Sequence, residues 1–100
     1  MKNTVTPTIA SVKLIDGLFS SHEAQEVLLD LVNSKIHFHE LKNFSSLERI
    51  GRPDPVAIQR LPELREERKS IMALTEYAEK NKCTLKITSA IRIELIEEGR

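Results

Sequence analysis

The segment KIHFHELKNFSSLERIGRPDP, residues 35–55, decides the fold because it holds the change of direction between the two most helical parts of the chain. Gly51 suits the position just past a helix end, where glycine readily adopts a left-handed backbone. Asp54 and Pro55 suit a helix start, as an N-cap followed by a proline at the first helical position. The segment therefore predicts a helix end, a tight turn and a second helix.

The same segment leaves the length of the first helix open. Nothing between Asn33 and Phe44 breaks a helix. Ser45 with Glu48 three residues later has the spacing of a capping box, which would start a short separate turn. Either the first helix continues past Ser34 to Phe44, or it stops earlier and this turn stands alone.

The first helix has a clear beginning. Ser20 and Glu23 fit a capping box, in which each side chain bonds to the backbone of the other residue. Apolar residues then recur at helical spacing, at Ala24, Val27, Leu28, Leu31 and Val32. On a helical wheel of about 100° per residue, the apolar face is centred on Ala24 and Leu31.

Pro62 interrupts the second helical stretch. Its ring clashes with the carbonyl four residues back, and it lacks an amide donor. An acidic group follows, as in the first turn of a new helix: Glu63, Glu66 and Glu67. We therefore expect a short helix from Asp54 to about Arg60, a break or kink within one turn before Pro62, and a main helix to about Asn81.

Two segments have the character of strands. Residues 12–15, VKLI, form a short apolar run that Asp16-Gly17 closes like a turn. Over residues 83–96, apolar side chains share one parity: Cys83, Leu85, Ile87, Ile91, Ile93 and Leu95. This alternation is typical of a strand with one buried face. We expect this strand to be longer than the first, with Cys83 as a small buried hydrophobe.

These elements predict an α+β fold in the order strand, helix, helix, strand. A helical hairpin would pack on a small antiparallel sheet as a two-layer β-α-α-β unit. Two strands alone are marginally stable, and a surplus edge needs cover. We therefore expect a homodimer that extends the sheet through the C-terminal strand. Residues 9–100 are expected to form a single domain, and residues 1–8 a flexible N-terminal arm.

Composition narrows the classes of function. The formal net charge is +0, so no overall field attracts nucleic acid or an anionic membrane. One cysteine and three histidines argue against a closed zinc site, and no motif calls for a cofactor. No apolar run approaches the about 20 residues that a membrane helix needs, and the first nine residues lack the apolar core of a secretory signal. We expect a cytoplasmic protein without a membrane partner.

Three basic residues fall on the predicted apolar faces. If the first helix continues, its face receives Lys35 and His39, together with Phe38 and Lys42. On the second helix, Arg68 lies within the face that other residues define: Leu61, Leu64, Ile71, Thr75 and Ala78. In an antiparallel hairpin, Lys35, His39 and Arg68 would converge, with the guanidinium at least partly shielded from water.

Two hypotheses explain this basic cluster. In the structural hypothesis, carboxylates neutralise the cations within the domain, because a buried charge is costly unless it is paired. The available carboxylates are Glu67, Glu63, Asp16 and Glu48. In the site hypothesis, Lys35, His39 and Arg68 bind a phosphate or carboxylate of a ligand, with the arginine as the bidentate element.

Catalytic motifs are not found in the sequence. No G-x-S-x-G surrounds Ser45 and Ser46, and there is no P-loop, G-x-G-x-x-G or H-E-x-x-H. Basic residues in the middle of the chain alternate with acids, which is typical of a solvated charged face and not of a nucleic-acid interface. We expect a non-enzymatic protein that acts through self-association or partner binding. The alternatives are a small-anion or nucleotide-binding regulatory protein that uses the basic cluster, and a nucleic-acid accessory protein.

Overall fold

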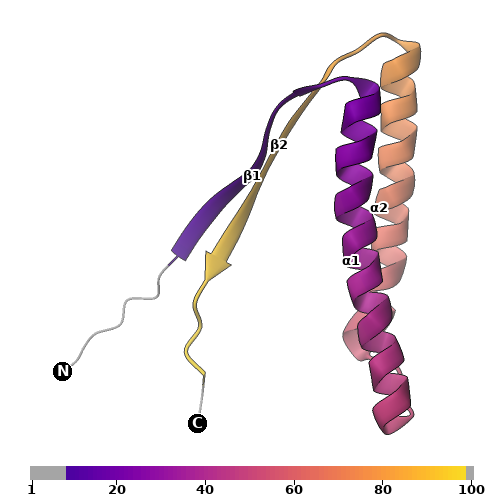
Figure 1. Cartoon of the computed structure of the whole chain (residues 1–100), viewed down its shortest axis with the longest axis vertical. Helices are drawn as coiled ribbons and strands as arrows, with labels where there is room; N and C mark the ends of the chain where they lie inside the picture. The colour runs from indigo at the N-terminus through magenta and orange to yellow at the C-terminus, as the bar shows by residue number, and fades with distance from the viewer. Residues whose placement is uncertain (1–8, 99–100) are drawn as a thin grey trace, which may run out of the picture. The chain divides into compact units, whose positions relative to one another are not determined.

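The computed structural model of the chain describes residues 9–98, which form four elements (Figure 1). In chain order they are β1 (Ile9–Phe19), α1 (Ser21–Ile50), α2 (Pro55–Lys80) and β2 (Leu85–Glu94). The predicted α+β class and the order of elements are confirmed. The arm predicted for residues 1–8 lies outside the described residues.

The chain divides into two compact units. One is a helical hairpin over Phe19–Leu85, and the other is a two-stranded ribbon formed by the strand residues outside that range. The single domain and the packing of the hairpin on the sheet stay predictions.

Helix α1 is one continuous helix of 30 residues. Of the two lengths considered for the first helix, the longer one is therefore correct. It starts at the predicted capping box, where Ser20 and Glu23 exchange two hydrogen bonds of 3.1 Å. It ends at Gly51, whose φ is 69° and whose N–H donates to the carbonyl of Leu47. No separate turn forms at Ser45, because nothing before that residue ends the helix.

Side chains near the end of α1 fasten the turn into α2. Asn43 Oδ1 accepts a hydrogen bond from the backbone N–H of Asp54 at 2.9 Å, and Ser46 Oγ donates to the carbonyl of Arg52 at 2.6 Å. Asp54 caps α2 as predicted, because its carboxylate accepts from the N–H of Ala57 at 2.9 Å. The turn therefore has its own hydrogen bonds and does not depend on apolar packing alone.

Pro62 does not divide α2, and the prediction of two separate helices is wrong. Helix α2 is continuous over 26 residues, with Pro62 inside it. The proline is exposed, whereas Leu61 and Leu64 on either side of it are buried in one cluster with Ile36 of α1. This packing fixes the helix before and after the proline, which compensates for one missing hydrogen bond.

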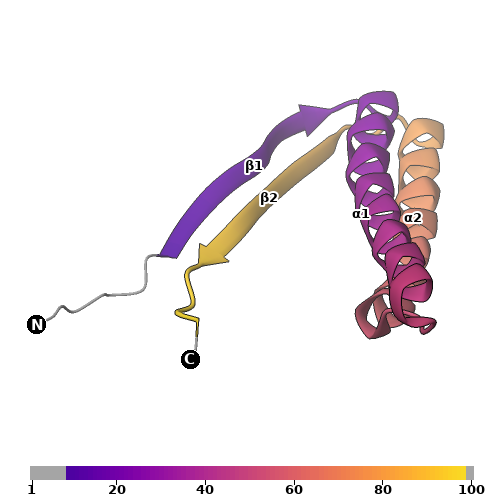
Figure 2. The ribbon, with the colours of Figure 1, turned by 60° about the horizontal axis from the view of Figure 1, so that its bottom comes forward.

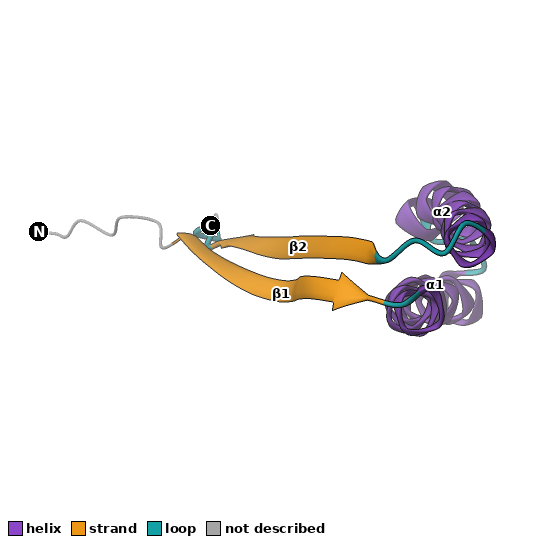
Figure 3. Cartoon of the chain, turned by 90° about the horizontal axis from the view of Figure 1, so that it is seen from above, coloured by secondary structure: helices purple, strands orange, loops and turns teal. Residues whose placement is uncertain are grey.

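The two helices lie side by side and pack along a narrow seam (Figures 1 and 3). The buried residues of α2 follow the heptad spacing of a coiled coil: Ala57, Leu61, Leu64, Thr75 and Ala78. Those of α1 are Ala24, Ile36 and His39. A side-chain hydrogen bond of 3.0 Å, from Gln25 Nε2 to Thr75 Oγ1, also joins the two helices.

The buried face of α1 is rotated from the predicted one. The wheel predicts Leu31 at the centre of this face, but Leu31 is exposed and Val32 packs against the core cluster. A seam with a heptad repeat drifts around a straight helix by about 20° per heptad. Over a helix as long as α1, a wheel centred on its first turns therefore loses the correct phase.

The end of α2 explains why the second strand starts later than predicted. Lys82 has a φ of 55°, and the N–H of Cys83 donates to the carbonyl of Ala78 at 2.8 Å. Residue 83 thus completes the helix end, and the strand begins at Leu85. Cys83 is exposed, so its predicted burial is wrong.

Strands β1 and β2 run antiparallel as a ribbon (Figure 2). β1 spans 11 residues and β2 spans 10, so the prediction of a longer second strand is wrong. β1 passes through Asp16 and Gly17, which were predicted to close it. An Asp-Gly pair favours a turn where the chain reverses, but β2 runs beside β1, and the hydrogen-bonded ladder keeps the backbone extended.

Gly51→Ala is expected to lower the free energy of unfolding by about 1 kcal/mol. The φ of 69° is strained for alanine, while nothing lies within 4 Å of the added methyl group, so the cost arises from backbone conformation alone. Urea unfolding followed by circular dichroism measures the change. Gly51→Asn is the matched control, because asparagine tolerates the left-handed region better, and it should lose less. Equal losses in the two variants would contradict this explanation.

Pro62→Ala is expected to raise the free energy of unfolding by about 1–3 kcal/mol, because an alanine restores the missing hydrogen bond of α2. The same urea titration measures it. Pro55→Ala is the control, since a proline at the first helical position costs nothing and its replacement should not stabilise. A Pro62→Ala protein no more stable than wild type would show that α2 accommodates this proline without cost.

Candidate functional site

The residues of the predicted basic cluster have different surroundings. The ammonium groups of Lys35 and Lys42 lie 5.9 and 5.8 Å from the ring centroid of Phe38, within the range of a cation–π interaction. His39 is buried in the hairpin seam, and its ring meets that of Phe38 edge-on, with centroids 5.2 Å apart. Lys35 is exposed, so His39 is the one member of the cluster that the seam buries.

Arg68 occupies a seam position by its spacing, but its side chain leaves the seam. The residue is exposed, and Nη1 donates to Asn33 Oδ1 of α1 at 3.1 Å. Arg68 is therefore not buried in the seam, and the predicted partial shielding of its guanidinium stays a prediction. The partner is a neutral amide and not one of the carboxylates considered from the sequence: Glu67, Glu63, Asp16 and Glu48.

No hydrogen bond or ion pair within residues 9–98 joins Lys35, His39 and Arg68 to one another. To bind a ligand together, Lys35 would have to leave Phe38 and Arg68 would have to leave Asn33. Their common role as an anion site stays a prediction.

Other basic residues in the middle of the chain pair with carboxylates. Arg65 Nη2 lies 3.1 Å from Glu40 Oε2 across the hairpin, and Arg60 pairs with Glu63 one turn away on α2. All four side chains are well exposed, so these pairs add little to stability. They do reduce the positive potential that a nucleic-acid backbone would need.

A cleft of about 170 Å³ lies beside the hairpin turn. Its lining residues are Lys42, Ser45, Ser46, Arg49, Ile50 and Asp54. Two of these already have structural roles, because Ser46 bonds to the carbonyl of Arg52 and Asp54 caps α2. The carboxylate of Asp54 also opposes the binding of an anion beside Arg49. We therefore assign this cleft to the construction of the turn.

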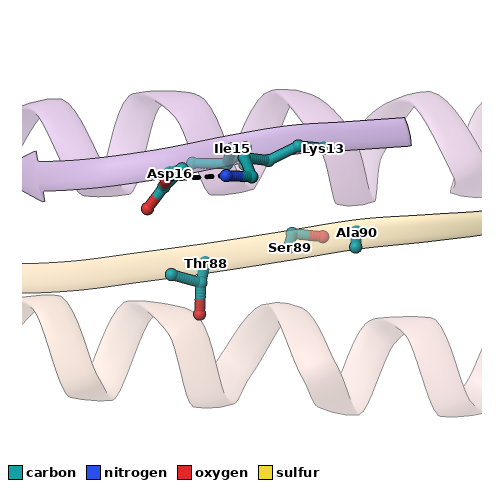
Figure 4. Close-up of a pocket in the computed structure, with 6 residues that line it drawn as sticks. All are labelled: Lys13, Ile15, Asp16, Thr88, Ser89 and Ala90. Carbon is teal, nitrogen blue, oxygen red and sulfur yellow. Dashed lines mark ion pairs between the residues drawn. The ribbon is translucent and has the colours of Figure 1, made fainter. Parts of the chain in front are cut away.

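A second hollow, of about 290 Å³, lies on the ribbon (Figure 4). Residues of both strands line it: Lys13, Ile15, Asp16, Thr88, Ser89 and Ala90. Lys13 Nζ lies 3.4 Å from Asp16 Oδ2, so the one carboxylate of the hollow is paired with a cation. The two hydroxyl groups have no histidine beside them in this lining, so the hollow lacks an activated nucleophile.

The outer edge of β2, residues 85–94, is a second feature of the ribbon that could form a site. β2 has β1 on one side, and no other strand among the described residues lies on its outer side. Its side chains Ile91 and Ile93 are 43% and 44% exposed. β1 buries Ile15 but likewise exposes large apolar residues: Ile9, Val12, Leu14 and Leu18. A free strand edge with exposed β-branched side chains is a surface that folded proteins normally cover. We refer to this surface as the β2 edge.

Comparison of the chain with protein-family models, with curated proteins and with solved structures found no match. Among residues 9–98, no group of three or more His, Cys, Asp or Glu side chains is placed to hold a metal ion. Neither α1 nor α2 combines the length and the apolar character needed to cross a membrane. The β2 edge is therefore chosen as the candidate site from its geometry and exposure.

Arg68→Met is expected to change the free energy of unfolding by less than about 1 kcal/mol. The substitution keeps the apolar stem, and the amide of Asn33 that it leaves behind is exposed and can bond to water. Arg65→Met, which removes the exposed ion pair with Glu40, should change the free energy of unfolding by a similarly small amount. Urea unfolding measures both variants. A loss of about 3 kcal/mol or more for Arg68→Met alone would mean that a buried charge depends on this arginine.

Proposed function

We propose that this is a small non-enzymatic protein of the cytoplasm that acts through self-association, with the β2 edge as its contact surface. The observation that carries the proposal is the exposure of Ile91 and Ile93 on a strand with one free side. A two-stranded ribbon is marginal by itself in water. A partner strand would satisfy the backbone groups of this edge and contact its side chains from one side.

The energetics favour a second copy. Covering Ile91 and Ile93 removes apolar area from water, which contributes on the order of 1 kcal/mol per side chain. The formal net charge of +0 gives two copies little reason to repel each other. Non-polar contact and backbone pairing would act at the same strand.

The alternative functions have weaker support. Small-anion binding by Lys35, His39 and Arg68 requires these residues to give up their present contacts with Phe38 and Asn33. Nucleic-acid binding requires free cations, and Arg60 and Arg65 are already paired with carboxylates. Self-association needs no such rearrangement of the β2 edge.

We expect the wild-type protein to be a dimer at high micromolar concentration and Ile93→Lys to dimerise about tenfold or more weakly, because the lysine removes an apolar contact across the strand pair from both copies. Light scattering coupled to size-exclusion chromatography measures both. Leu74→Lys is the control, since Leu74 is an exposed apolar residue on α2 and its replacement should leave the dimer intact. A wild-type monomer would overturn the proposal, and so would a dimer that only Leu74→Lys disrupts.

A further inference from the structure

We infer that two copies pair β2 against β2 about a two-fold axis at Ala90, so that Lys86 of each copy lies opposite Glu94 of the other. The inference rests on the proposed self-association and specifies the partner strand, the axis and the register. It follows from the order of residues along β2.

Symmetry leaves few registers available. A two-fold axis perpendicular to the sheet makes the strands antiparallel and keeps each face of β2 on its own side. Side chains directly opposite each other in such a pair point to the same face, so even-numbered residues face even-numbered ones. The axis must then pass beside a single residue. Because β2 spans Leu85–Glu94, the longest overlap places the axis at Ser89 or Ala90.

Charge distinguishes these two registers. The residues of the even-numbered face are all exposed: Lys86, Thr88, Ala90, Arg92 and Glu94. With the axis at Ser89, Lys86 would lie opposite Arg92 of the other copy, and this repulsion would occur twice. With the axis at Ala90, Lys86 lies opposite Glu94 twice, and Arg92 lies opposite Thr88. Opposite charges across a strand pair stabilise it and like charges destabilise it, so the register at Ala90 is favoured.

The odd-numbered face fits either register. At Ala90, Ile87 lies opposite Ile93 and Ser89 lies opposite Ile91. At Ser89, Ile87 lies opposite Ile91 and Leu85 lies opposite Ile93, so this register gains one apolar pair, repeated by symmetry. The register at Ala90 gains one attraction between charges and avoids one repulsion, each repeated by symmetry, and this charge difference outweighs the apolar pair. In both cases the two ribbons join into a four-stranded sheet with one continuous apolar face, and the alanine methyl groups at the axis leave room for the strands to approach.

Disulfide formation tests the axis. In a Cys83→Ser background, which removes the exposed native thiol, Ala90→Cys should link two copies. Residues directly opposite in an antiparallel pair have Cα atoms about 4.5–5.5 Å apart, within the range that a disulfide spans. Thr88→Cys is the matched control on the same face, because its two copies would be about 14 Å apart. We expect Ala90→Cys to link under mild oxidation and Thr88→Cys to remain unlinked.

Charge exchange tests the register independently. Lys86→Glu and Glu94→Lys should each weaken dimerisation by about tenfold or more, and the double variant should return the Kd to within about threefold of wild type. In the register at Ser89, Lys86→Glu would instead face Arg92 and tighten the dimer. Sedimentation equilibrium measures these constants.

The outcomes separate the inference from the proposal on which it rests. A Cys83→Ser protein that stays monomeric overturns both. A dimer in which Ala90→Cys fails to link, or links no better than Thr88→Cys, overturns the axis while self-association stands. A tighter Lys86→Glu dimer, or a double variant as weak as the single ones, overturns the charge pairing.

Discussion

The helical hairpin is held together by a narrow seam in which small side chains are as numerous as large ones, and this limits the stability that the chain obtains from its own core. Alanines and one threonine account for half of the buried seam, and Ile36, Leu61 and Leu64 are the larger apolar members. Small side chains let two helices approach closely but remove little apolar area from water, at about 25 cal/mol per Å². Hydrogen bonds at the helix ends and across the turn therefore matter more here than in a domain with a thick core.

The same thin core leaves many large apolar side chains outside it. The ribbon has one buried isoleucine, Ile15, while Ile91 and Ile93 remain exposed. A pair of strands has two free edges and two faces, and it cannot cover all of them with its own residues. Both strands therefore keep exposed apolar residues, Leu14 and Leu18 on β1 and Ile91 and Ile93 on β2, and the proposed partner strand would act on β2.

Local signals in the sequence predicted where the helices begin and end, whereas long-range packing determined whether β1 and α2 continue past their glycine and proline. The capping box at Ser20 and the Asp54-Pro55 start act within one turn, so they can be recognised without a structure. The passage of β1 through Gly17 and the continuity of α2 through Pro62 depend on neighbours far away in the sequence, which overrode the local preference. Cys83 followed the parity of the strand, but a hydrogen bond to the end of α2 placed it outside β2. The apolar alternation of residues 85–95 was visible in the sequence, because it shows which face of a strand carries apolar residues. The surroundings of Arg68 could not be predicted, because a long side chain can extend away from the position of its Cα.

The two edges of the ribbon differ in charge, and this difference affects whether the proposed association would form a dimer or a filament. β1 carries the paired charges of Lys13 and Asp16 and a glycine, Gly17, near its end, which are features that discourage another strand from adding to an edge. β2 has a cation near its start, Lys86, and a carboxylate at its end, Glu94, so two antiparallel copies of β2 can place opposite charges side by side. A contact that uses the same edge on both copies closes after two chains, whereas a contact between unlike edges would continue into a filament. The proposed pairing of β2 with β2 would therefore close after two chains and leave the charged β1 edges at the outside of the sheet.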